Sequence, residues 1–466
     1  MKLEEDTMSL SVIVLAAGKG TRMRSSLSKV LHTLAGKTLI ERVLNSAYQL
    51  NPSQVVVVYG HQGETLKAAL NKIFPKLEWA LQAEPQGTAH AVLQALALIP
   101  DNHQVLILSA DVPLISAVTL QRLIDETPEP AMGMITAVLS EPAGLGRIVR
   151  DHKNAVIRVV EEKDASVQEK TIQEVNSNIF YIKAALLKRW LPSFQANNQQ
   201  KEYYLPDLVS ASYREKLLIH VLAPTSAMEI EGINDKLQLA NLERKLQRQL
   251  AEDFMLKGVT ILDPNRLDIR GEVEIEADVT LDINIILEGR VVIKSGARIG
   301  PQCVLKNCTV EKGAIIKAHS LIDGAHIGPF CEVGPFARLR PGTVLAEASR
   351  IGNFVEIKQA TVGKNSKINH LSYVGDATIG QDVNVGAGTI TCNYNGVIKQ
   401  QTIIEDGAFI GVHVQLVAPV RVGTEATIGA GTTLTKDAPA QQLTLSRAPL
   451  RTVADWVSPL KRQDEK

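Results

Sequence analysis

The sequence predicts an α/β protein: an N-terminal domain with a mixed, mostly parallel sheet, then a linker helix, then a C-terminal parallel β-helix of hexapeptide repeats. Three observations predict this order. Buried-strand patterns alternate with helical patterns in residues 10–230, strong helix formers fill residues 235–257, and runs of aliphatic residues with a step of six recur across about residues 268–435. A chain of 466 residues also favours more than one domain.

The first domain is expected to be Rossmann-like. Residues 10–17 (LSVIVLAA), 55–58 (VVVV) and 105–108 (VLIL) have the pattern of buried parallel strands, and a helical pattern runs through residues 39–50. Strands that alternate with helices imply a mostly parallel sheet. Ligands of such sheets bind at the carboxyl ends of the strands, so the segments after the first and third strands are expected to meet at one crevice.

A glycine-rich loop, Gly18–Met23, follows the first strand. It is neither a G-x-x-x-x-G-K-[ST] nor a G-x-G-x-x-G motif, but its glycines let backbone N–H groups approach a phosphate. Lys19, Arg22 and Lys29 can neutralise a polyphosphate. A plain strand-to-helix turn is the alternative. Asp111, which ends the third strand, either serves solvation alone or binds magnesium opposite the loop.

A helix is expected between the two domains. Five apolar residues spaced three or four apart place one apolar stripe along residues 235–257, and Gly258 stands where a C-terminal capping glycine belongs. A helix internal to one domain is the alternative. The predicted boundaries give domains at 1–234 and 259–466, with the linker at 235–258. The stripe consists of Leu239, Leu242, Leu246, Leu250 and Phe254.

The second domain is expected to be a stack of β-helical coils that begins near Leu267. A step of six is neither the 3.6-residue period of a helix nor the alternation of a half-buried strand. One six-residue unit makes one side of a coil, and coils must stack because one coil alone cannot bury its apolar face. An ordinary β-rich domain with chance spacing is the alternative, and the number of in-phase units disfavours it. The step is clearest at Ile327, Val333, Leu339, Leu345, Ile351 and Ile357.

Composition excludes several classes of partner. Lys+Arg and Asp+Glu both number 50, which argues against a nucleic-acid partner or an anionic membrane surface. No apolar run reaches the ~18 residues of a membrane span, and the acidic N-terminus has no signal-peptide core. Four cysteines without metal or redox spacing suggest a reducing compartment. We therefore expect a cytoplasmic protein that acts on small molecules, without nucleic-acid or membrane partners.

One segment of the β-helix carries candidate chemistry. Lys358 follows Arg340 by eighteen residues, which we take as three coils on the same side, and such a basic column suits a phosphate ester. His370 lies nearby in sequence, close to Tyr373. A lone histidine is often structural, but an imidazole near neutral pKa also suits a base that takes a proton from an attacking amine. The rhythm breaks at 391–396, which predicts a projecting loop.

Eight segments resemble the sugar-1-phosphate nucleotidyltransferases. With the hexapeptide repeats, nearly the whole chain resembles the family of bacterial bifunctional UDP-N-acetylglucosamine pyrophosphorylases / glucosamine-1-phosphate N-acetyltransferases, whose β-helix is left-handed and whose members are trimers with the acetyl site between subunits. The segments are 15–23 (LAAGKGTRM) with Lys29, 82–90 (QAEPQGTAH), 111–114 (DVPL), 144–147 (GLGR), 160–164 (VEEKD), 174–176 (EVN), 202–204 (EYY) and 231–234 (EGIN).

The resemblance implies a uridylyltransferase site in the first domain. There the phosphate of N-acetylglucosamine-1-phosphate attacks the α-phosphorus of UTP and pyrophosphate leaves. Lys29 and Arg22 are implied to stabilise the triphosphate charge, and Asp111 and Asn234 to hold Mg²⁺. The implied nucleotide-sugar site comprises Leu15, Ala16, Ala17, Gly18, Lys29, Gln82, Gly87, Thr88, Ser109, Ala110, Asp111, Gly146, Glu161, Asn176 and Asn234. Of these, Gln82, Gly87 and Thr88 are implied for the uracil and ribose, and Gly146, Glu161 and Asn176 for the sugar.

The resemblance also implies an acetyltransferase site in the second domain, which acts first in making UDP-N-acetylglucosamine, a precursor of bacterial envelope polysaccharides. His370 is the implied base, helped by Glu356. The implied glucosamine-1-phosphate site comprises Arg340, Lys358, Tyr373 and Asn384. The implied acetyl-CoA site comprises Ala387, Asn393, Tyr394, Val412, Ala430 and Arg447.

Three positions depart from the family pattern. Ser28 replaces a proline, Ala110 replaces a glycine and is expected to place a methyl near the nucleotide, and Val412 replaces a serine beside the cofactor arm. Two other functions stay open on the sequence: a nucleotidyltransferase for another sugar with a degenerate acyltransferase, which Val412 alone supports, and a non-enzymatic scaffold with a nucleotide-sensing domain. The charged groups around Asp111 and His370 argue against the scaffold.

Overall fold

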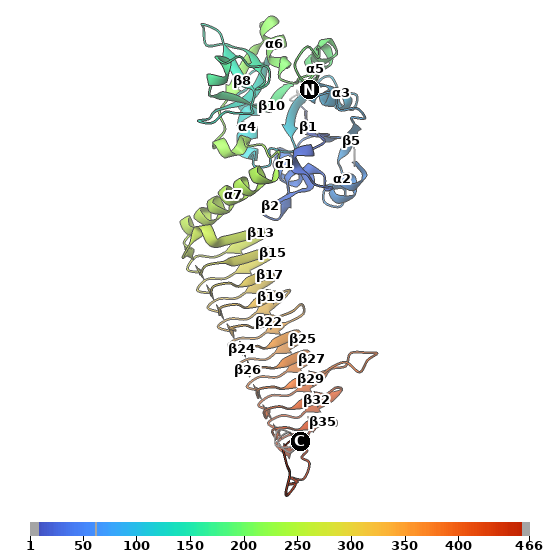
Figure 1. The fold of residues 1–466 in the computed structure, drawn as a ribbon, viewed down its shortest axis with the longest axis vertical. Helices are drawn as coiled ribbons and strands as arrows, with labels where there is room; N and C mark the ends of the chain where they lie inside the picture. The colour runs from blue at the N-terminus through green and yellow to red at the C-terminus, as the bar shows by residue number, and fades with distance from the viewer. Residues whose placement is uncertain (1–8, 61–62, 459–466) are drawn as a thin grey trace, which may run out of the picture. The chain divides into compact units, whose positions relative to one another are not determined.

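The computed structural model describes residues 9–60 and 63–458, which divide into two compact units between Leu246 and Gln247 (Figure 1). A single helix, α7 (Lys236–Leu256), contributes residues to both units. The domain bounds expected from the sequence, at 234 and 258, stay a prediction. No helix among the described residues is both long enough and apolar enough to cross a membrane.

The first unit contains a nine-stranded sheet in the order β11-β7-β10-β6-β1-β4-β5, with β8 and β9 attached beside β10. The central strands β6, β1, β4 and β5 are parallel and β10 is antiparallel, so the sheet is mixed and mostly parallel, as predicted. The strands are β1 (Leu10–Ala16), β4 (Gln54–Tyr59), β5 (Glu78–Leu81), β6 (Gln104–Ser109), β7 (Ala131–Val138), β8 (Arg147–Arg150), β9 (Val156–Val160), β10 (Glu174–Lys183) and β11 (Leu218–Leu222); β2 (Thr33–Leu34) and β3 (Lys37–Thr38) form a separate hairpin.

Helices cover both faces of this sheet, because its central strands are apolar on both faces. Alternate residues of β1 belong to two separate apolar clusters: Val12 and Val14 to one, Ile13 to the other. The helices of this unit are α1 (Leu39–Tyr48), α2 (Gly63–Leu70), α3 (Thr88–Leu96), α4 (Ala117–Glu126), α5 (Ala184–Trp190) and α6 (Asp207–Arg214), with short 3-10 turns η1 (Thr21–Met23), η2 (Lys29–Leu31), η3 (Glu169–Thr171), η4 (Leu191–Ser193) and η5 (Ala227–Ile230).

Helix α7 ends as the sequence predicts. Gly258 adopts φ +93°, a conformation that disfavours other residues. Its N–H donates to the carbonyl of Met255 at 3.0 Å, and the next N–H, of Val259, donates to Phe254 at 3.1 Å. These two bonds form a Schellman cap, which satisfies the last carbonyls of the helix and turns the chain into the first β-helical strand.

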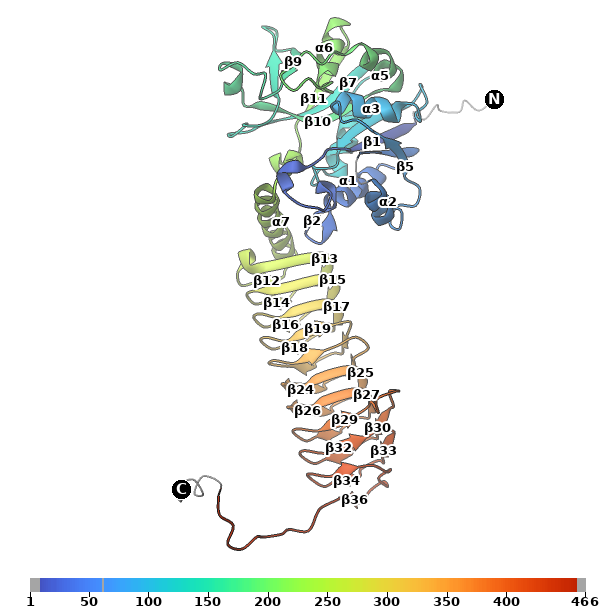
Figure 2. The ribbon, with the colours of Figure 1, turned by 45° about the vertical axis from the view of Figure 1, so that its right-hand side comes forward.

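The second unit is a parallel β-helix whose coils stack through strand pairing (Figure 2). One side of the coils forms an eleven-stranded sheet: β12 (Thr260–Ile261), β14 (Thr280–Leu281), β16 (Arg298–Ile299), β18 (Ile315–Ile316), β21 (Glu332–Val333), β24 (Arg350–Asn353), β26 (Lys367–His370), β28 (Asn384–Val385), β31 (Phe409–Ile410), β34 (Thr427–Ile428) and β36 (Leu443–Thr444).

The other sides form a fourteen-stranded sheet, and a 3-10 turn, η6 (Pro264–Arg266), precedes it. Its strands are β13 (Leu267–Ile275), β15 (Ile285–Ile293), β17 (Val304–Val310), β19 (Leu321–Asp323), β20 (His326–Ile327), β22 (Arg338–Leu339), β23 (Val344–Leu345), β25 (Glu356–Val362), β27 (Tyr373–Ile379), β29 (Ile390–Cys392), β30 (Thr402–Ile404), β32 (Gln415–Val417), β33 (Val420–Val422) and β35 (Thr433–Leu434).

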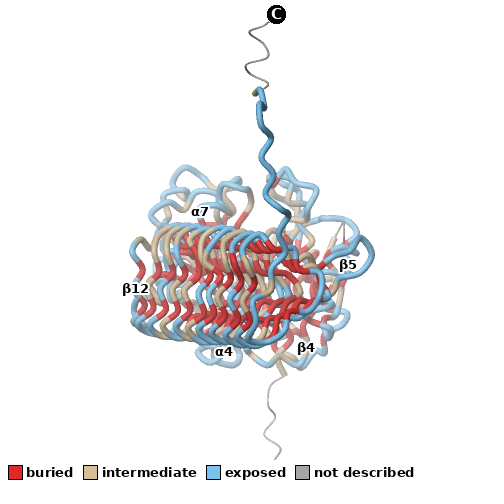
Figure 3. The backbone as a smooth tube through the Cα atoms, turned by 90° about the horizontal axis from the view of Figure 1, so that it is seen from below, coloured by how far each residue is buried: buried red, intermediate tan, exposed pale blue. Residues whose placement is uncertain are grey.

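The aliphatic residues of the hexapeptide step fill the axis of the coils, as predicted. Leu339, Ile351 and Ile357 are each at most 1% exposed, and the buried positions line the inside of the stack in Figure 3. The stack is longer than expected. It begins at Thr260, before Leu267, because a two-residue side suffices to pair with β14, and it ends at Thr444 in β36.

The expected spacing of Arg340 and Lys358 is wrong in one respect. Arg338 and Leu339 pair with Glu356 and Ile357 on the directly adjacent strand, so eighteen residues make one coil and not three. Three six-residue units form the three sides of one coil. The two cations therefore lie on neighbouring coils, which brings them closer together than the sequence analysis assumed.

The predicted projecting loop is present. Val385 pairs with Ile410, so this coil spans 25 residues in place of the usual 17 or 18. Residues 393–401 form a projection between β29 and β30 (Figure 1), closed by an antiparallel bridge between Tyr394 and Lys399.

Truncation of Ile357 to alanine is expected to destabilise the β-helix by about 2–5 kcal/mol, because the axis is closely packed and the cavity left behind cannot be refilled. Thr361→Ala on the same strand is the control, because Thr361 points outward and should change stability by less than about 0.5 kcal/mol. Calorimetry at one protein concentration compares the two variants. Equal transition temperatures would contradict the inward assignment.

Candidate active sites

The first candidate site lies where β1 and β6 end. Leu15 of β1 pairs with Ser109 of β6, and the amide of Ala110 donates to the Leu15 carbonyl at 3.0 Å, so the loops that follow both strands start from one edge. A cavity of about 400 Å³ opens there. Leu15, Ala17, Gly18, Lys19, Gln82, Pro85, Gly87, Thr88, Ala91, Ser109, Asp111 and Glu202 line it.

Four predicted residues meet in one polar cluster beside this cavity. The Lys29 ammonium lies 2.5 Å from Asp111 Oδ2 and 3.1 Å from Asn234 Oδ1, and Arg22 also donates to Asn234 Oδ1, at 3.0 Å. The Lys29 side chain is only 12% exposed, so these contacts act with limited solvent screening. Lys29 and Asn234 thus come into contact although they are 205 residues apart in sequence.

The donor set of this cluster fits a hard divalent cation. A carboxylate oxygen of Asp111 and an amide oxygen of Asn234 already point at one positive charge, that of Lys29. Magnesium takes six oxygens and usually keeps water and substrate phosphate among them. No cluster of three or more His, Cys, Asp or Glu side chains suited to a metal occurs among the described residues, so phosphate or water oxygens must complete any such shell.

Residues predicted for the base and ribose form the opposite wall. The buried Gln82 side chain donates from Nε2 to the Gly87 carbonyl at 3.0 Å and lies 3.0 Å from His90 Nδ1. Thr88 Oγ1 accepts the N–H of Leu205 at 3.0 Å. A buried amide fixed in this way presents its remaining carbonyl oxygen in one direction, as recognition of a base edge requires.

Gly87 can only be glycine in this backbone. Its φ is +112° and ψ 175°, a region that only glycine adopts readily. A Cβ there would lie 2.5 Å from the carbonyl oxygen of Tyr203. This close approach lets the segment that contains Tyr203 pack against the start of α3.

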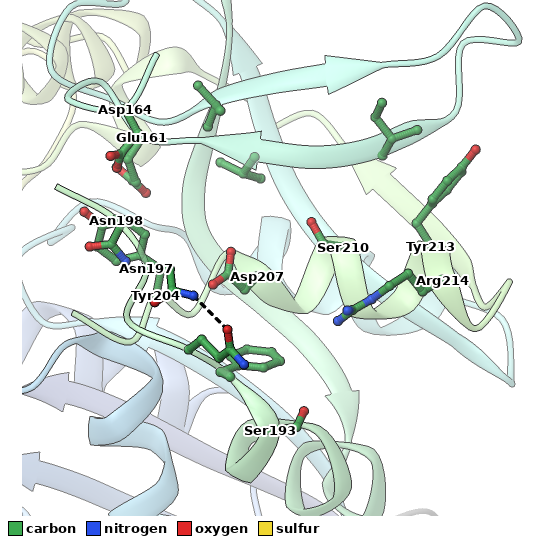
Figure 4. Close-up of a pocket in the computed structure, with 15 residues that line it drawn as sticks. Glu161, Asp164, Ser193, Asn197, Asn198, Tyr204, Asp207, Ser210, Tyr213 and Arg214 are labelled. Carbon is green, nitrogen blue, oxygen red and sulfur yellow. Dashed lines mark hydrogen bonds between the residues drawn. The ribbon is translucent and has the colours of Figure 1, made fainter. Parts of the chain in front are cut away.

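The three residues predicted for the sugar are also together. The backbone N–H of Asn176 donates to the Gly146 carbonyl at 2.9 Å. A Cβ added to Gly146 would lie 3.1 Å from Glu161 Oε1. Glu161 faces a larger cavity of about 690 Å³, between β9 and α6 (Figure 4). Burial raises the pKa of its carboxyl, and neighbouring Asp164 and Asp207 raise it further.

One departure from the family pattern, Ala110, lies in the core of the first unit. Ala110 is fully buried within an apolar cluster on one face of the sheet, while its neighbours Ser109 and Asp111 line the 400 Å³ cavity. The expectation that its methyl lies near a nucleotide stays a prediction. Ser28 lines a neighbouring cavity together with Gly18 and Lys19.

The second candidate site lies on the β-helix, on the coils around β25 and β27. Arg340 donates to Glu356 Oε1 at 2.8 Å, and Glu356 is in register with Tyr373 on the next coil. Lys358 pairs in register with Gly375, whose missing Cβ leaves room for the Tyr373 hydroxyl. Arg340, Glu356, Lys358 and Tyr373 therefore share one side of the stack.

His370 has a partner that the sequence analysis missed. Its Nδ1 lies 2.9 Å from Asn353 Oδ1, and the two residues are in register on adjacent coils. An amide oxygen only accepts, so Nδ1 donates in this contact, and in the neutral form of the ring the lone pair is then on Nε2. The signal was present in the sequence, because Asn353 precedes His370 by one coil of seventeen residues.

A third cation near Lys358 was also missed. The Lys399 ammonium, from the projecting loop, lies against that of Lys358, and this repulsion lowers the pKa of Lys399. The loop is tied down on its near side, because Asn393 donates to Asp376. A loop residue cannot be placed by the six-residue step, so periodicity gave no means of finding Lys399.

The remaining predicted residues lie elsewhere on the chain. Asn384 is on the eleven-stranded sheet, in register with Lys367 and Phe409, and is not brought to Tyr373 within one chain. Ala387 and Val412 lie at matching places on adjacent coils, because the backbone N–H of His413 donates to the Ala387 carbonyl at 2.8 Å.

Ala430 continues this column, since a Cβ on Gly411 would meet its amide nitrogen. Tyr394 is exposed on the projecting loop. Arg447 follows β36, is exposed, and forms no hydrogen bond or ion pair with the described residues.

Known proteins resemble both units. A family model described as MobA-like NTP transferase domain matches residues 12–172, and one described as GMPPB C-terminal domain matches residues 269–352. The Bifunctional protein GlmU of Methylococcus capsulatus is 50% identical over 459 residues, which cover 98% of this chain and 99% of that protein. The chain belongs to the GlmU family.

Two further GlmU proteins agree with this assignment. That of Pseudoalteromonas atlantica is 47% identical over 454 residues, covering 97% of this chain and 100% of the relative. That of Marinobacter nauticus is 47% identical over 452 residues, covering 97% and 99%. The family resemblance found in the sequence is confirmed, and the GlmU match extends through the nucleotide cluster and the His370 coils alike.

Replacement of Gly87 by alanine is expected to destabilise the first unit by about 2 kcal/mol or more, because a Cβ is strained at this φ and overlaps Tyr203. Gly18→Ala is the matched control: a Cβ there meets no atom within 4 Å, so thermal unfolding without ligand should be unchanged. A Gly87→Ala protein as stable as the wild type would contradict the close approach.

Proposed function

We propose that each unit carries one of the two reactions of the GlmU family. The chain is a bifunctional enzyme that makes UDP-N-acetylglucosamine through an acetyltransferase and a uridylyltransferase activity. Acetyl-CoA first acetylates glucosamine-1-phosphate at the His370 coils. UTP then reacts with the product in the first unit. The convergence of Lys29, Asp111 and Asn234 at the carboxyl edge of the sheet carries this proposal.

In the uridylyl transfer, a phosphate oxygen of N-acetylglucosamine-1-phosphate attacks the α-phosphorus of UTP, and the bond to pyrophosphate breaks. The protein supplies position and charge and no nucleophile. Lys29 and Arg22 stabilise the negative charge on the triphosphate, and Gln82 reads the uracil. Asp111 and Asn234 would hold Mg²⁺, which neutralises phosphate charge when bound.

Sugar recognition in this unit falls to Gly146, Glu161 and Asn176, and the loop after β1 offers backbone N–H groups to the phosphates. Gly18 supports this role because nothing lies within 4 Å of its missing Cβ, so a phosphate can approach its backbone. Leu15, Ala16 and Ala17 complete the wall beside Ser109.

In the acetyl transfer, the amine of glucosamine-1-phosphate attacks the thioester carbon of acetyl-CoA, and the bond to sulfur breaks. Nε2 of His370 takes a proton from the attacking nitrogen, and the thiolate of CoA receives a proton as it leaves. Asn353 fixes the ring with its free nitrogen available. Glu356 acts by holding Arg340, which lies 2.8 Å away.

Three cations receive the phosphate of the amino sugar. Lys358 and Lys399 lie against each other, with Asp376 near Lys399, and Arg340 is one coil away on the same side. Two ammonium groups repel in water, and a phosphate between them removes that repulsion. Tyr373 closes the same side.

Acetyl-CoA binding and the completion of this site involve a homotrimer. Asn384, Ala387, Val412 and Ala430 lie along the coils away from Tyr373 in one chain, and a neighbouring copy brings the two sets to one cleft. A column of exposed apolar side chains supports packing of a neighbouring copy against this part of the β-helix. The rings of Phe336 and Phe354 stack with their centroids 5.2 Å apart, and Leu371 on the next coil is also exposed. In a trimer the three clefts are equivalent. Asn393, Tyr394 and Arg447 complete the cofactor site.

The two activities are expected to separate by mutation. His370→Ala should reduce acetyl transfer by about 10²–10⁴-fold, the usual contribution of a general base, and leave uridylyl transfer intact. Asp111→Ala should abolish uridylyl transfer and leave acetyl transfer intact, because the two residues lie in separate units. Mass spectrometry measures the product from glucosamine-1-phosphate and, in a parallel reaction, from N-acetylglucosamine-1-phosphate, each with Mg²⁺, UTP and acetyl-CoA.

Wild-type protein should give UDP-N-acetylglucosamine in both reactions. Product from N-acetylglucosamine-1-phosphate alone would mean that the β-helix no longer acetylates. Loss of both activities in either variant, with its fold intact, would refute independent sites.

Val412 is expected to weaken acetyl-CoA binding. It is 47% exposed and replaces a family serine with an apolar side chain, so one hydroxyl for the cofactor arm is lost. Val412→Ser should lower the KM for acetyl-CoA by about five- to tenfold, as one restored neutral hydrogen bond allows, with kcat nearly unchanged. Steady-state kinetics with acetyl-CoA varied measures both. An unchanged KM would show that this position does not contact the cofactor.

A further inference from the structure

Three carboxyl groups line the cavity beside the sugar residues (Figure 4). Glu161 and Asp164 follow β9, and Asp207 stands in the first turn of α6. Only Glu161 is assigned to the sugar in the proposed function. Asp164 and Asp207 have no role in the reaction so far, although they face the same space.

The positive charge near these carboxyls is largely engaged elsewhere. The buried Arg147 donates to Glu162 Oε2 at 2.7 Å and to the Leu145 carbonyl. Its charge lowers the pKa of Glu161, but burial and the two aspartates outweigh this effect and the pKa of Glu161 is raised. Arg214, on α6, lines the same cavity. Burial and Asp164 raise the pKa of Asp207, and Arg214 offsets this only in part. Three partly buried carboxylates cannot all ionise at low cost with so little compensation.

The pKa of the Tyr204 phenol is also raised by the carboxylates around this cavity. It lines the cavity too, and burial together with Asp164, Glu161 and Glu202 raises the pKa of Tyr204 to about 12. Tyr204 is therefore neutral and adds no charge. The titratable groups that face Glu161 are thus Asp164, Asp207 and Tyr204, with Arg147 from β8.

Of the three carboxyls, Glu161 is the best place for a proton. Asp164 Oδ1 accepts the N–H of Gln199 at 3.0 Å. Asp207 stands in the first turn of α6, where the helix dipole and the nearby Arg214 favour its negative charge, although burial raises the pKa of Asp207. No residue in the described part of the chain donates a hydrogen bond to the Glu161 carboxyl. Burial and both aspartates raise the pKa of Glu161.

We propose that Asp164 and Asp207 are positioning residues that keep a proton on Glu161, so that Glu161 meets the sugar as a neutral carboxylic acid and donates a hydrogen bond to it. The acceptor is an oxygen of the N-acetylated sugar, either a hydroxyl or the amide carbonyl. This inference rests on the proposed sugar site. It assigns the charge state of that site, which family membership does not give.

A neutral Glu161 suits the ligand. The sugar phosphate and UTP are both anionic, and a third carboxylate beside them would add repulsion in a partly buried site. A carboxylic acid held neutral by its surroundings, in contrast, contributes a donor without charge. The two aspartates therefore help sugar binding from a distance, through Glu161.

Binding of UDP-N-acetylglucosamine should then depend on pH with a definite sign. Affinity is full below the pKa of Glu161 in the free protein and falls as pH rises through it, by up to about tenfold per pH unit. Calorimetric titration of the full-length protein from about pH 5 to about pH 8.5 measures this, since the diphosphate ester of the ligand does not titrate over that range. UTP, which lacks the N-acetylglucosamine moiety, is the reference ligand. Because its terminal phosphate titrates at about pH 6, the affinity of each variant for UTP is compared with that of the wild type at the same pH.

Three variants test the assignment. Glu161→Gln should bind the nucleotide sugar nearly as the wild type does at low pH and lose the Glu161 step. Asp207→Asn and Asp164→Asn should each move that step to lower pH, by on the order of one unit, because one neighbouring charge is removed. Asp125→Asn makes the same charge change on the exposed end of α4 and should leave the step in place.

The possible outcomes separate this inference from the proposed function. No binding of UDP-N-acetylglucosamine at any pH, with UTP bound normally, would overturn the sugar site itself. Sugar-specific affinity that does not vary with pH in the wild type would overturn only the proton on Glu161. So would weak binding of Glu161→Gln at every pH, or a step unmoved in both aspartate variants.

Discussion

Parallel pairing of strands is the constraint on which both candidate sites depend. In the first unit it brings the ends of β1 and β6 to one edge of the sheet, so that the glycine-rich loop and Asp111 start side by side at that edge. In the second unit it places residues one coil apart side by side, which aligns Arg340 with Lys358 and Asn353 with His370. Parallel strands need long connections. Those connections are a helix in one case and the rest of a coil in the other, and each delivers side chains to a fixed place.

The two sites handle charge in opposite ways. On the β-helix, Lys358 and Lys399 lie close together and their repulsion lowers the pKa of Lys399 despite the nearby Asp376, an arrangement that favours an anion. In the first unit, the cations Lys29 and Arg22 are held by Asp111 and Asn234, while the carboxyls of Glu161, Asp164 and Asp207 line a separate cavity. A substrate that is anionic at one end and an uncharged polyol at the other would match this separation, with the charged end at the cations and the neutral end at Glu161, which we propose to be protonated. Electrostatic complementarity of this kind sets orientation more than affinity.

Much of this arrangement could be predicted from the sequence. The buried strands 10–17, 55–58 and 105–108, the helix cap at Gly258 and the filled axis of the β-helix follow from local patterns. The family motifs named residues such as Lys29, Asp111 and Asn234, which the fold brings together from distant parts of the chain. Three things were out of reach. The coil length needs the geometry of three sides, so Arg340 and Lys358 were placed too far apart; Lys399 lies in a loop that no period describes; and the clustering of Asp164 with Asp207 depends on how α6 packs beside β9.

The 25-residue coil has a consequence for how this fold can change length. Every inward and outward position along the stack is set by register with the coil before it, so one residue inserted within a side would turn the following side chains inside out. The chain tolerates coils of 17, 18 and 25 residues because the differences are absorbed at corners, and the largest one forms the projection at 393–401. Corners are therefore where new segments can be grafted without disturbing the coils above and below. In this protein the projection at 393–401 brings Lys399 to Lys358, so the fold can add a charged group by lengthening a corner while the sides of the coils stay unchanged.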